Sequence, residues 1–358
     1  MTVPRIRVLL VDDSLTVRRR LADVLGADSD IEVVGEAGDG KSAIERCREL
    51  RPDVVTLDMM LPVMTGLAAT EYIMAHFPTP ILIVSSSTNR GELFKTYDAL
   101  AAGAVDVFEK PHGHERDGEW ERGFCAAVKM ASRIKVITHV RARLGALGRS
   151  VPPAPHWGAR PRSSHTVQLV ALGASTGGPA ALIEVLSRIP KALPVPIAIV
   201  LHLDEVFGAA FADWLDAQTQ HRVVYAREGQ PVASFAGRVA LAPPGRHLLV
   251  AGGRFHVTSD PPRNYCRPSV DVLFESIALD YGPSAAACLL TGMGKDGAAG
   301  LLAVRKAGGT TLAQDERTSV VYGMPREAAI LGAAEQVLPI DAIGPALAEL
   351  AGVRGGVE

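Results

Sequence analysis

The chain has 358 residues, which is long enough for two domains of typical size. Apolar residues make up 47% of it and charged residues 21%, so composition requires neither extensive disorder nor a coiled coil. A formal net charge of −2 excludes the global basic field that would gather nucleic acid or an anionic membrane.

The cysteines indicate a reducing compartment. They are far apart and include no C-x-x-C pair, which argues against a zinc site and against a disulfide framework. The first residues lack the apolar core of a signal peptide, and no stretch reaches the roughly 20 apolar residues that would span a bilayer. We therefore expect a cytoplasmic monomer that is not inserted in a membrane. The four cysteines are Cys47, Cys125, Cys266 and Cys288.

Short apolar runs alternate with helical patterns over the first third of the chain. Such alternation predicts a parallel sheet with helices on both faces. The five expected strands are residues 8–11, 31–36, 54–57, 81–84 and 105–108.

A second region of the same kind follows a change in composition. Apolar spacing over residues 124–140 suits a helix, and the Pro-rich, basic residues 150–164 predict an extended linker. Alternation then resumes, with expected strands at residues 169–172, 197–201, 239–242 and 286–290. The predicted fold class is α/β, with two doubly wound parallel-sheet domains. These are a flavodoxin-like domain at 5–125, a helix and linker at 126–165, and a Rossmann-like domain at 166–352.

Acidic side chains follow two strands of the first domain. Asp12 and Asp13 come after the first strand and Asp58 after the third, so all three should meet at the carboxyl edge of the sheet, where ligands bind. Three carboxylates there would repel one another and would favour a hard cation such as Mg²⁺. Lys110 and Ser85 follow two further strands and can reach the same edge. The pattern predicts a site for transfer of an anionic group, although paired aspartates can also be merely solvated.

This arrangement resembles the receiver domain of two-component response regulators. The resemblance implies that Asp58 accepts a phosphoryl group from a histidine kinase and becomes an aspartyl phosphate. It also implies that Lys110 and Ser85 contact the phosphoryl oxygens. The implied Mg²⁺ ligands are Asp12, Asp13, Asp58 and the backbone carbonyl of Met60.

The sequence departs from the receiver pattern at two places. Both concern how phosphorylation is coupled to the rest of the protein, and not phosphorylation itself. The family's usual M-P-x-M-D-G is here L-P-V-M-T-G at residues 61–66, with Thr65 in place of the aspartate. Val107 stands where the family usually has an aromatic switch residue, and Phe108, one place later, should face the other side of its strand.

A glycine-rich turn opens the second domain. Residues 173–177 read G-A-S-T-G between a strand and a helix, which matches the G-x-S-x-G turn that exposes a nucleophilic serine, here Ser175. The same turn can instead cradle a nucleotide phosphate at a helix N-terminus, and by itself it does not decide between the two. His202 ends the next apolar strand, and Asp296 lies in a glycine-rich turn after another, so a Ser-His-Asp triad can form at one edge. Glycines around Met293 leave backbone N–H groups free for an oxyanion.

Five longer segments of this domain lie at residues 173–178, 242–248, 267–273, 290–297 and 313–325. They resemble the chemotaxis protein-glutamate methylesterases. The resemblance implies hydrolysis of glutamate methyl esters on methyl-accepting chemoreceptors, and deamidation of receptor glutamines, without a cofactor for the esterase reaction. It assigns Ser175 as nucleophile, His202 as general base and then acid, Asp296 as its orienting partner and the Met293 N–H to the oxyanion hole, with Thr176 in support.

Several features leave alternatives open. The family's usual Q-H-M-P is here L-H-L-D around His202, which bears on the lip of the cleft and on the identity of the substrate. Arg267 can either clamp an acidic receptor helix or cap local structure, and we favour the substrate side. The pair Asp315 and Glu316 is expected to be structural.

The alternative functions of the protein are a signalling scaffold with a degenerate enzyme domain and a nucleotide-binding output domain. The histidines of the 112–114 loop are expected to be solvated and not to bind metal.

Overall fold

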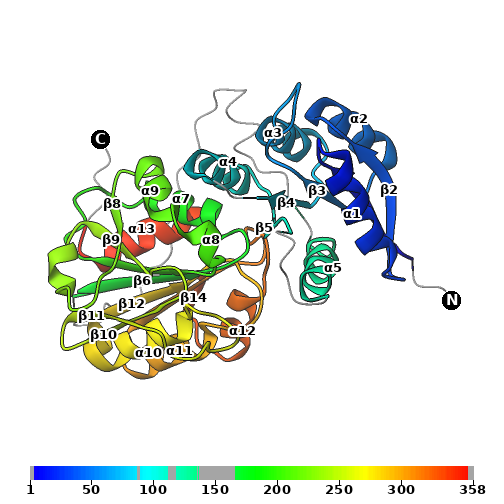
Figure 1. Ribbon diagram of the computed structural model, residues 1–358. Helices are drawn as coiled ribbons and strands as arrows, with labels where there is room; N and C mark the ends of the chain where they lie inside the picture. Colours follow the sequence, from blue (N-terminus) through cyan, green and yellow to red (C-terminus); the bar gives the residue numbers. More distant parts are fainter. Residues whose placement is uncertain (1–3, 87–88, 112–117, 135, 137–165, 354–358) are drawn as a thin grey trace. The chain divides into compact units, whose positions relative to one another are not determined.

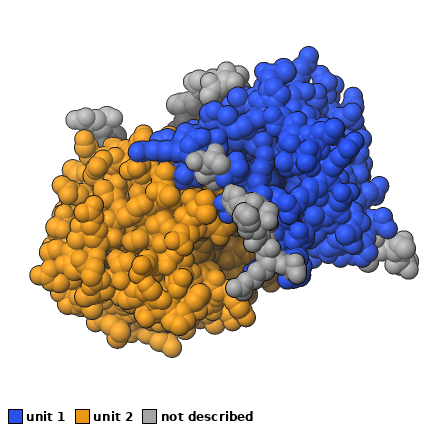
Figure 2. Space-filling model, in the orientation of Figure 1, with its two compact units in different colours: residues 1–150 blue, residues 151–358 orange. Residues whose placement is uncertain are grey.

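The computed structural model describes residues 4–86, 89–111, 118–134, 136 and 166–353. The chain divides into two compact units, Met1–Ser150 and Val151–Glu358, which are considered separately (Figure 2). The predicted linker at 150–164, part of the predicted helix at 124–140, and both His112 and His114 lie outside the described residues. In the described part of the chain, no helix combines the length and apolar character needed to cross a membrane.

The first unit is a five-stranded parallel sheet in the order β2-β1-β3-β4-β5. Figure 1 shows α1 and α5 on one face of this sheet and α2, α3 and α4 on the other, so the predicted flavodoxin-like arrangement is confirmed. The strands are β1 (Ile6–Val11), β2 (Ile31–Ala37), β3 (Val54–Leu57), β4 (Ile81–Ser85) and β5 (Asp106–Glu109). The helices are α1 (Leu15–Gly26), α2 (Gly40–Leu50), α3 (Gly66–His76), α4 (Arg90–Ala101) and α5 (Glu119–Ala131).

The turn after β3 shows how the unusual L-P-V-M-T-G sequence is accommodated. Thr65 is the N-cap of α3, and its hydroxyl accepts a hydrogen bond from the Ala68 N–H at 3.3 Å. Threonine thus fills the capping role that suits aspartate equally well. The next residue, Gly66, packs so closely that a Cβ there would collide with the backbone carbonyl of Asp58. The glycine therefore lets the start of α3 lie directly against Asp58.

The side chains of β5 alternate as predicted. Val107 is buried on one side of the strand, whereas Phe108 packs against Trp120 and Phe124 of α5, with both pairs of ring centroids 5.6 Å apart. Phe108 therefore belongs to the α5 side of the sheet and does not replace the aromatic residue that the family places at position 107.

The second unit contains a seven-stranded parallel sheet in the order β14-β13-β12-β6-β7-β9-β8, together with an antiparallel hairpin, β10–β11. Helices α7 and α13 cover one face, and α10, α11 and α12 cover the other (Figure 1), which confirms the predicted Rossmann-like architecture. The strands are β6 (Leu169–Ala174), β7 (Ile197–Leu201), β8 (Arg222–Tyr225), β9 (Arg238–Leu241), β10 (His247–Ala251), β11 (Arg254–Thr258), β12 (Ala285–Leu289), β13 (Thr310–Gln314) and β14 (Gln336–Leu338). The helices are α7 (Gly178–Ser187), α8 (Glu205–Gly208), α9 (Phe211–Gln218), α10 (Val270–Tyr281), α11 (Ala298–Lys306), α12 (Met324–Ile330) and α13 (Ile340–Leu350).

Both sheets have a point at which the strand order reverses. In the first unit β1 is followed in the chain by β2 on one side, while β3 lies on the other side. In the second unit the chain leaves β6 toward β7, β9 and β8, and returns to β12 on the opposite side of β6. In open α/β sheets, ligands bind at the carboxyl ends of the strands at such a reversal.

Helix α10 anchors the second unit. Its buried positions Val270, Leu273, Phe274 and Ile277 follow the i, i+3, i+4, i+7 spacing of one helix face. This face packs against β6, β10 and β12 in the core. The start of α10 is therefore fixed with respect to the carboxyl end of the sheet.

Replacing Phe274 by alanine should lower the free energy of unfolding by about 3–5 kcal/mol, because the ring is fully buried and its removal leaves a cavity. Leu279 lies on the same helix but is 90% exposed, and its replacement by alanine should cost less than about 0.5 kcal/mol. Scanning calorimetry of the full chain compares the two variants. Equal losses would contradict the packing described here.

Candidate functional sites

The three predicted carboxylates of the first unit lie together. Asp12 follows β1 and Asp58 follows β3, both are buried, and one carboxylate oxygen from each of Asp12, Asp13 and Asp58 lies within 4.8 Å of the others. Lys110 Nζ lies 2.7 Å from Asp12 Oδ2 and 2.8 Å from Asp58 Oδ2. The ammonium therefore offsets part of the repulsion between the two buried carboxylates.

The protonation behaviour of this site follows from burial and from Lys110. Burial raises the pKa of Asp58, and the nearby ammonium opposes this rise without cancelling it. Burial also lowers the pKa of Lys110, but attraction to Asp58 and hydrogen bonds to both carboxylates outweigh it and leave the pKa raised. A donor set made only of carboxylate oxygens fits a hard cation such as Mg²⁺.

The other predicted residues of this site have clear positions. Ser85 ends β4, is buried, and accepts a hydrogen bond through its carbonyl from the Lys110 N–H at 2.9 Å, so the two residues are neighbours. Met60 is 46% exposed, and its backbone N–H donates to Asp58. Contact of Ser85 with a phosphoryl group and of the Met60 carbonyl with a cation stay predictions.

The turn that carries Ser175 joins β6 to α7. Ser175 is partly exposed, and its N–H donates to the Thr291 carbonyl at 3.0 Å. Gly177 has φ of +77° and precedes α7, and a Cβ there would lie 2.6 Å from that of Val320. The glycine thus permits a turn that presents the Ser175 hydroxyl near a helix N-terminus.

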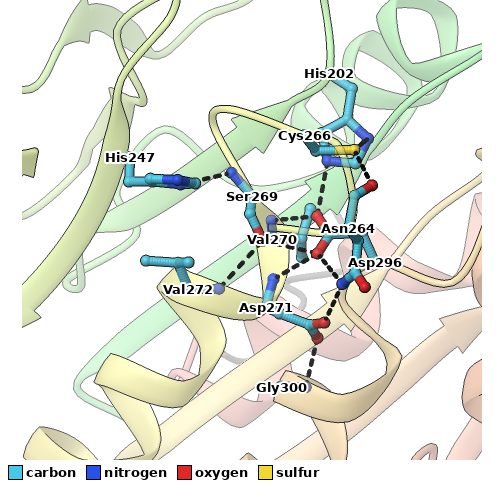
Figure 3. A network of polar contacts seen from close by, with 10 residues as sticks. All are labelled: His202, His247, Asn264, Cys266, Ser269, Val270, Asp271, Val272, Asp296 and Gly300. Carbon is cyan, nitrogen blue, oxygen red and sulfur yellow. Dashed lines mark hydrogen bonds and ion pairs between the residues drawn. The ribbon is translucent and has the colours of Figure 1, made fainter. Parts of the chain in front are cut away.

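His202 and Asp296 form a direct pair (Figure 3). His202 follows β7, and its N–H donates to the carbonyl of Ala174, the residue before Ser175. Its ring Nε2 lies 2.8 Å from Asp296 Oδ2. The predicted base and its orienting partner are therefore in contact, and both lie beside the turn that holds Ser175.

Asp296 is buried against the N-terminus of α10. It accepts hydrogen bonds from the Val270 N–H at 2.6 Å, from Ser269 Oγ at 2.7 Å and from Asn264 Nδ2 at 3.1 Å (Figure 3). Burial raises the pKa of Asp296, but its hydrogen bond with His202, the charge of His202 and the other donors outweigh this and lower it to about 2. The positive end of the helix dipole also favours a carboxylate at this place.

The other nitrogen of the His202 ring faces a cysteine. Nδ1 lies 3.7 Å from Cys266 Sγ. Among the described residues, no hydrogen bond joins Ser175 to His202, so the structure assembles the histidine–aspartate pair but not the complete hydrogen-bonded triad. Burial lowers the pKa of His202, whereas the interactions with Asp296 and Cys266 outweigh burial and raise it to about 9.

The predicted oxyanion donor lies next to the serine. Gly292 approaches Ser175 so closely that a Cβ at Gly292 would lie 2.8 Å from that of Ser175. The following residue, Met293, is partly exposed, and no residue in the described part of the chain accepts a hydrogen bond from its N–H. A free backbone donor beside the nucleophile is what an oxyanion site requires.

A buried polar network supports the strand ends behind Ser175. The Thr291 hydroxyl donates to the carbonyl of Thr176 at 3.0 Å, and the Thr291 N–H donates to Gln314 Oε1 at 2.8 Å. Gln314 is itself tied to Thr318 through its amide nitrogen. Thr176 is thus buried and is held through its backbone carbonyl, and its supporting role in catalysis stays a prediction.

Sequence reasoning missed five residues around His202 and Asp296. Asn264 donates from Nδ2 to both Asp296 and Asp271, and Ser269 caps α10. Buried His247 accepts from the Ser269 N–H through Nδ1 at 3.1 Å. A serine before the Val-Asp-Val-Leu helix start signals the cap, but no local pattern reveals that Asn264, Asp271 and Cys266 lie around Asp296 and His202.

Two further predicted residues have structural partners. The exposed Arg267 donates from Nη1 to the carbonyls of Ser259 and Asp260, at 3.2 and 3.4 Å, so its role on the substrate side stays a prediction. Asp315 accepts a hydrogen bond from the Thr318 N–H at 3.0 Å, in agreement with its predicted structural role.

Comparisons with known proteins cover both units. The response regulator receiver domain family matches residues 8–116, and the CheB methylesterase family matches residues 170–347. A protein-glutamate methylesterase/protein-glutamine glutaminase of Anaeromyxobacter dehalogenans is 44% identical over 96% of this chain and 97% of its own length. One from Nitrosospira multiformis is 42% identical over 98% of each chain. The crystal structure of the Thermotoga maritima CheB methylesterase catalytic domain is 36% identical, with a TM-score of 0.49, over 52% of this chain and 99% of that one. The chain therefore belongs to the protein-glutamate methylesterase/protein-glutamine glutaminase family.

Proposed function

We propose that this protein hydrolyses glutamate methyl esters on chemoreceptors, and deamidates glutamines there, under the control of phosphorylation at Asp58. The observation that carries the proposal is the His202–Asp296 pair, fixed to the buried N-terminus of α10 beside the glycine turn of Ser175. Two relatives named protein-glutamate methylesterase/protein-glutamine glutaminase, which align over nearly their whole length, support the choice of substrate. The triad alone supplies only a reaction type.

The catalytic roles follow from which atoms of His202, Ser175 and Met293 are free to contact the substrate. Asp296 occupies Nε2 of His202, so Nδ1 is the nitrogen that can accept the Ser175 proton as Oγ attacks the ester carbonyl. The Met293 N–H stabilises the oxyanion, and His202 returns the proton to the departing methanol. Water then cleaves the acyl-serine by the same base, which restores the free carboxylate. Deamidation follows the same steps with ammonia as the leaving group.

The position of Cys266 raises a second candidate for the nucleophile. Its sulfur, rather than the Ser175 hydroxyl, lies against Nδ1 of His202 in the structure, which is the arrangement of a cysteine hydrolase. Ser175 is favoured because a glycine turn presents it at the start of α7 and beside the free Met293 N–H, whereas Cys266 lies in the Arg263–Cys266 turn and not in a strand-to-helix turn of that kind.

The acidic site of the first unit supports phosphoryl transfer. We infer that Asp12, Asp13, Asp58 and the Met60 carbonyl hold Mg²⁺, which when bound neutralises charge on the transferring phosphoryl oxygens. Membership of the receiver domain family supports Asp58 as the acceptor. Its carboxylate is buried next to Lys110, which can move its ammonium onto the new phosphoryl group. A histidine kinase is the inferred phosphodonor, and Ser85 is the inferred hydroxyl partner of the phosphoryl oxygens.

Replacing Ser175 by alanine should reduce methanol release from a methylated chemoreceptor fragment by roughly 10⁴-fold or more, because the nucleophile is lost. Ser187→Ala changes an exposed serine at the other end of α7 and should leave release unaltered. Cys266→Ala distinguishes the two nucleophiles. If that variant loses all release while Ser175→Ala keeps it, the assignment of Ser175 is wrong.

Asp58→Asn should abolish phosphate incorporation from a small-molecule phosphodonor in the presence of Mg²⁺, and with it any stimulation of methanol release. The matched control is Asp53→Asn, because Asp53 flanks the opposite end of β3 and is exposed. Radiolabel incorporation and methanol release are measured on the same samples. Stimulation that persists in Asp58→Asn would contradict the role of Asp58.

The rate should rise with pH toward the pKa of His202, because only the neutral imidazole can accept the Ser175 proton and its pKa is raised to about 9. NMR titration of the ring should give the same pKa. In Asp296→Asn the pKa should fall toward 6.5, its ordinary value, since the carboxylate that favours the imidazolium is gone. A His202 pKa that does not change in this variant would refute the electrostatic account of the pair.

A further inference from the structure

We propose that His202 Nδ1 and Cys266 Sγ form a binding site for a thiophilic divalent cation, with Zn²⁺ as the best match, and that its occupation blocks hydrolysis. The binding site rests on geometry alone. The block rests on the proposed function, because it requires His202 to be the general base.

The separation of the two ligand atoms fits a tetrahedral zinc centre. Zinc bonds to sulfur are about 2.3 Å long and those to histidine nitrogen about 2.0–2.1 Å, so a tetrahedral angle places the two donors about 3.5–3.6 Å apart. Nδ1 and Sγ lie 3.7 Å apart in the structure. Only a small adjustment is needed for both atoms to bind one ion.

The other nitrogen of the ring is already in the state that metal-binding histidines require. Nε2 lies 2.8 Å from Asp296, and a carboxylate at that distance holds the Nε2 proton and leaves the Nδ1 lone pair for the metal. Asp296 itself is occupied by donors from Ser269, Val270 and Asn264. The carboxylate therefore orients the histidine and is not expected to be a third ligand, although its atoms also lie within 4.8 Å of the pair.

Cys266 is held in place by a tight turn. The N–H and carbonyl groups of Arg263 and Cys266 bond to each other in both directions, at 3.1 and 2.8 Å. The two residues between them, Asn264 and Tyr265, have φ of +50° and +64°, the left-handed values of a type I′ turn. Because Asn264 also donates to Asp296, the turn that carries the sulfur is tied to the partner of His202.

The chemistry of the two donors selects the ion. A thiolate and an imidazole favour zinc and similar soft or borderline ions, whereas the carboxylate cluster of Asp12, Asp13 and Asp58 suits Mg²⁺. On binding, the thiol proton and any proton on Nδ1 pass to solvent. Two protein ligands leave the remaining positions to water. An ion bonded to Nδ1 occupies the lone pair that would accept the Ser175 proton. Hydrolysis is therefore blocked while the ion is bound.

Cobalt provides a direct test on the full-length protein, with a phosphine reductant and excess Mg²⁺ to fill the acidic site. Co²⁺ bound to a thiolate gives a charge-transfer absorption that Mg²⁺ sites do not give, and Zn²⁺ should displace it. Cys266→Ser should weaken Co²⁺ and Zn²⁺ binding by roughly tenfold or more, and Asp296→Asn by about 10–100-fold through the orientation of the ring. Cys125→Ser, at a partly exposed free cysteine of the other unit, should bind as the wild type does.

A second readout separates this inference from the proposed function. Methanol release by the wild type should fall in Zn²⁺ along the same curve as cobalt displacement and should return after chelation, while Cys266→Ser should need roughly tenfold more Zn²⁺ or above for the same fractional loss. No thiolate absorption in the wild type, or equal absorption in Cys266→Ser, overturns the site. Full hydrolysis with the metal bound overturns the block. Absorption that depends on Cys266, without methanol release under any condition, supports the site and refutes the esterase assignment.

Discussion

The arrangement of the second unit depends on one interaction, the seating of the Asp296 carboxylate on the N-terminus of α10. The Val270 N–H donates to Asp296 Oδ2, the same oxygen that faces the His202 ring, and the Ser269 hydroxyl donates to Oδ1. Burial of an isolated carboxylate is expensive, so these donors and the helix dipole are what allow Asp296 to stay charged. The same contacts fix the direction of the imidazole. Core packing of α10 thereby sets the geometry of the site.

Both units position their functional side chains in the same way, although the chemistry of the two sites differs. Each collects its polar groups at the carboxyl ends of strands next to a reversal of strand order, β1 and β3 in one and β6 and β12 in the other. In the first unit a partly buried cation, Lys110, stabilises two carboxylates. In the second, a buried carboxylate stabilises an imidazole. The first arrangement is suited to binding an anionic group with a hard metal, the second to moving a proton.

The sequence predicts those parts of the fold in which a buried strand is an unbroken apolar run. The expected strands at 54–57 and 197–201 coincide with β3 and β7, and Asp58 and His202 follow from them directly. Strands β8, β13 and β14 are short or polar and give no such signal. The Gly252-Gly253 pair is typical of a two-residue hairpin loop, and it joins β10 to β11. Pairing of His202 with Cys266, 64 residues later, has no local pattern, and a rule based on C-x-x-C spacing therefore finds no zinc donors.

In the second unit, several groups compete for a single atom, Nδ1 of His202. Because Asp296 holds Nε2, every partner of His202 must approach through Nδ1, whether it is the Ser175 hydroxyl, the Cys266 thiol or a cation. In the structure the Cys266 thiol lies against Nδ1, and among the described residues no hydrogen bond joins Ser175 to His202. Formation of the triad thus requires the Ser175 hydroxyl to displace the sulfur from Nδ1. The strength of the contact between Cys266 and His202 then sets how much of the protein is ready to react, since a ready state that is only fractionally populated lowers the observed rate by that fraction.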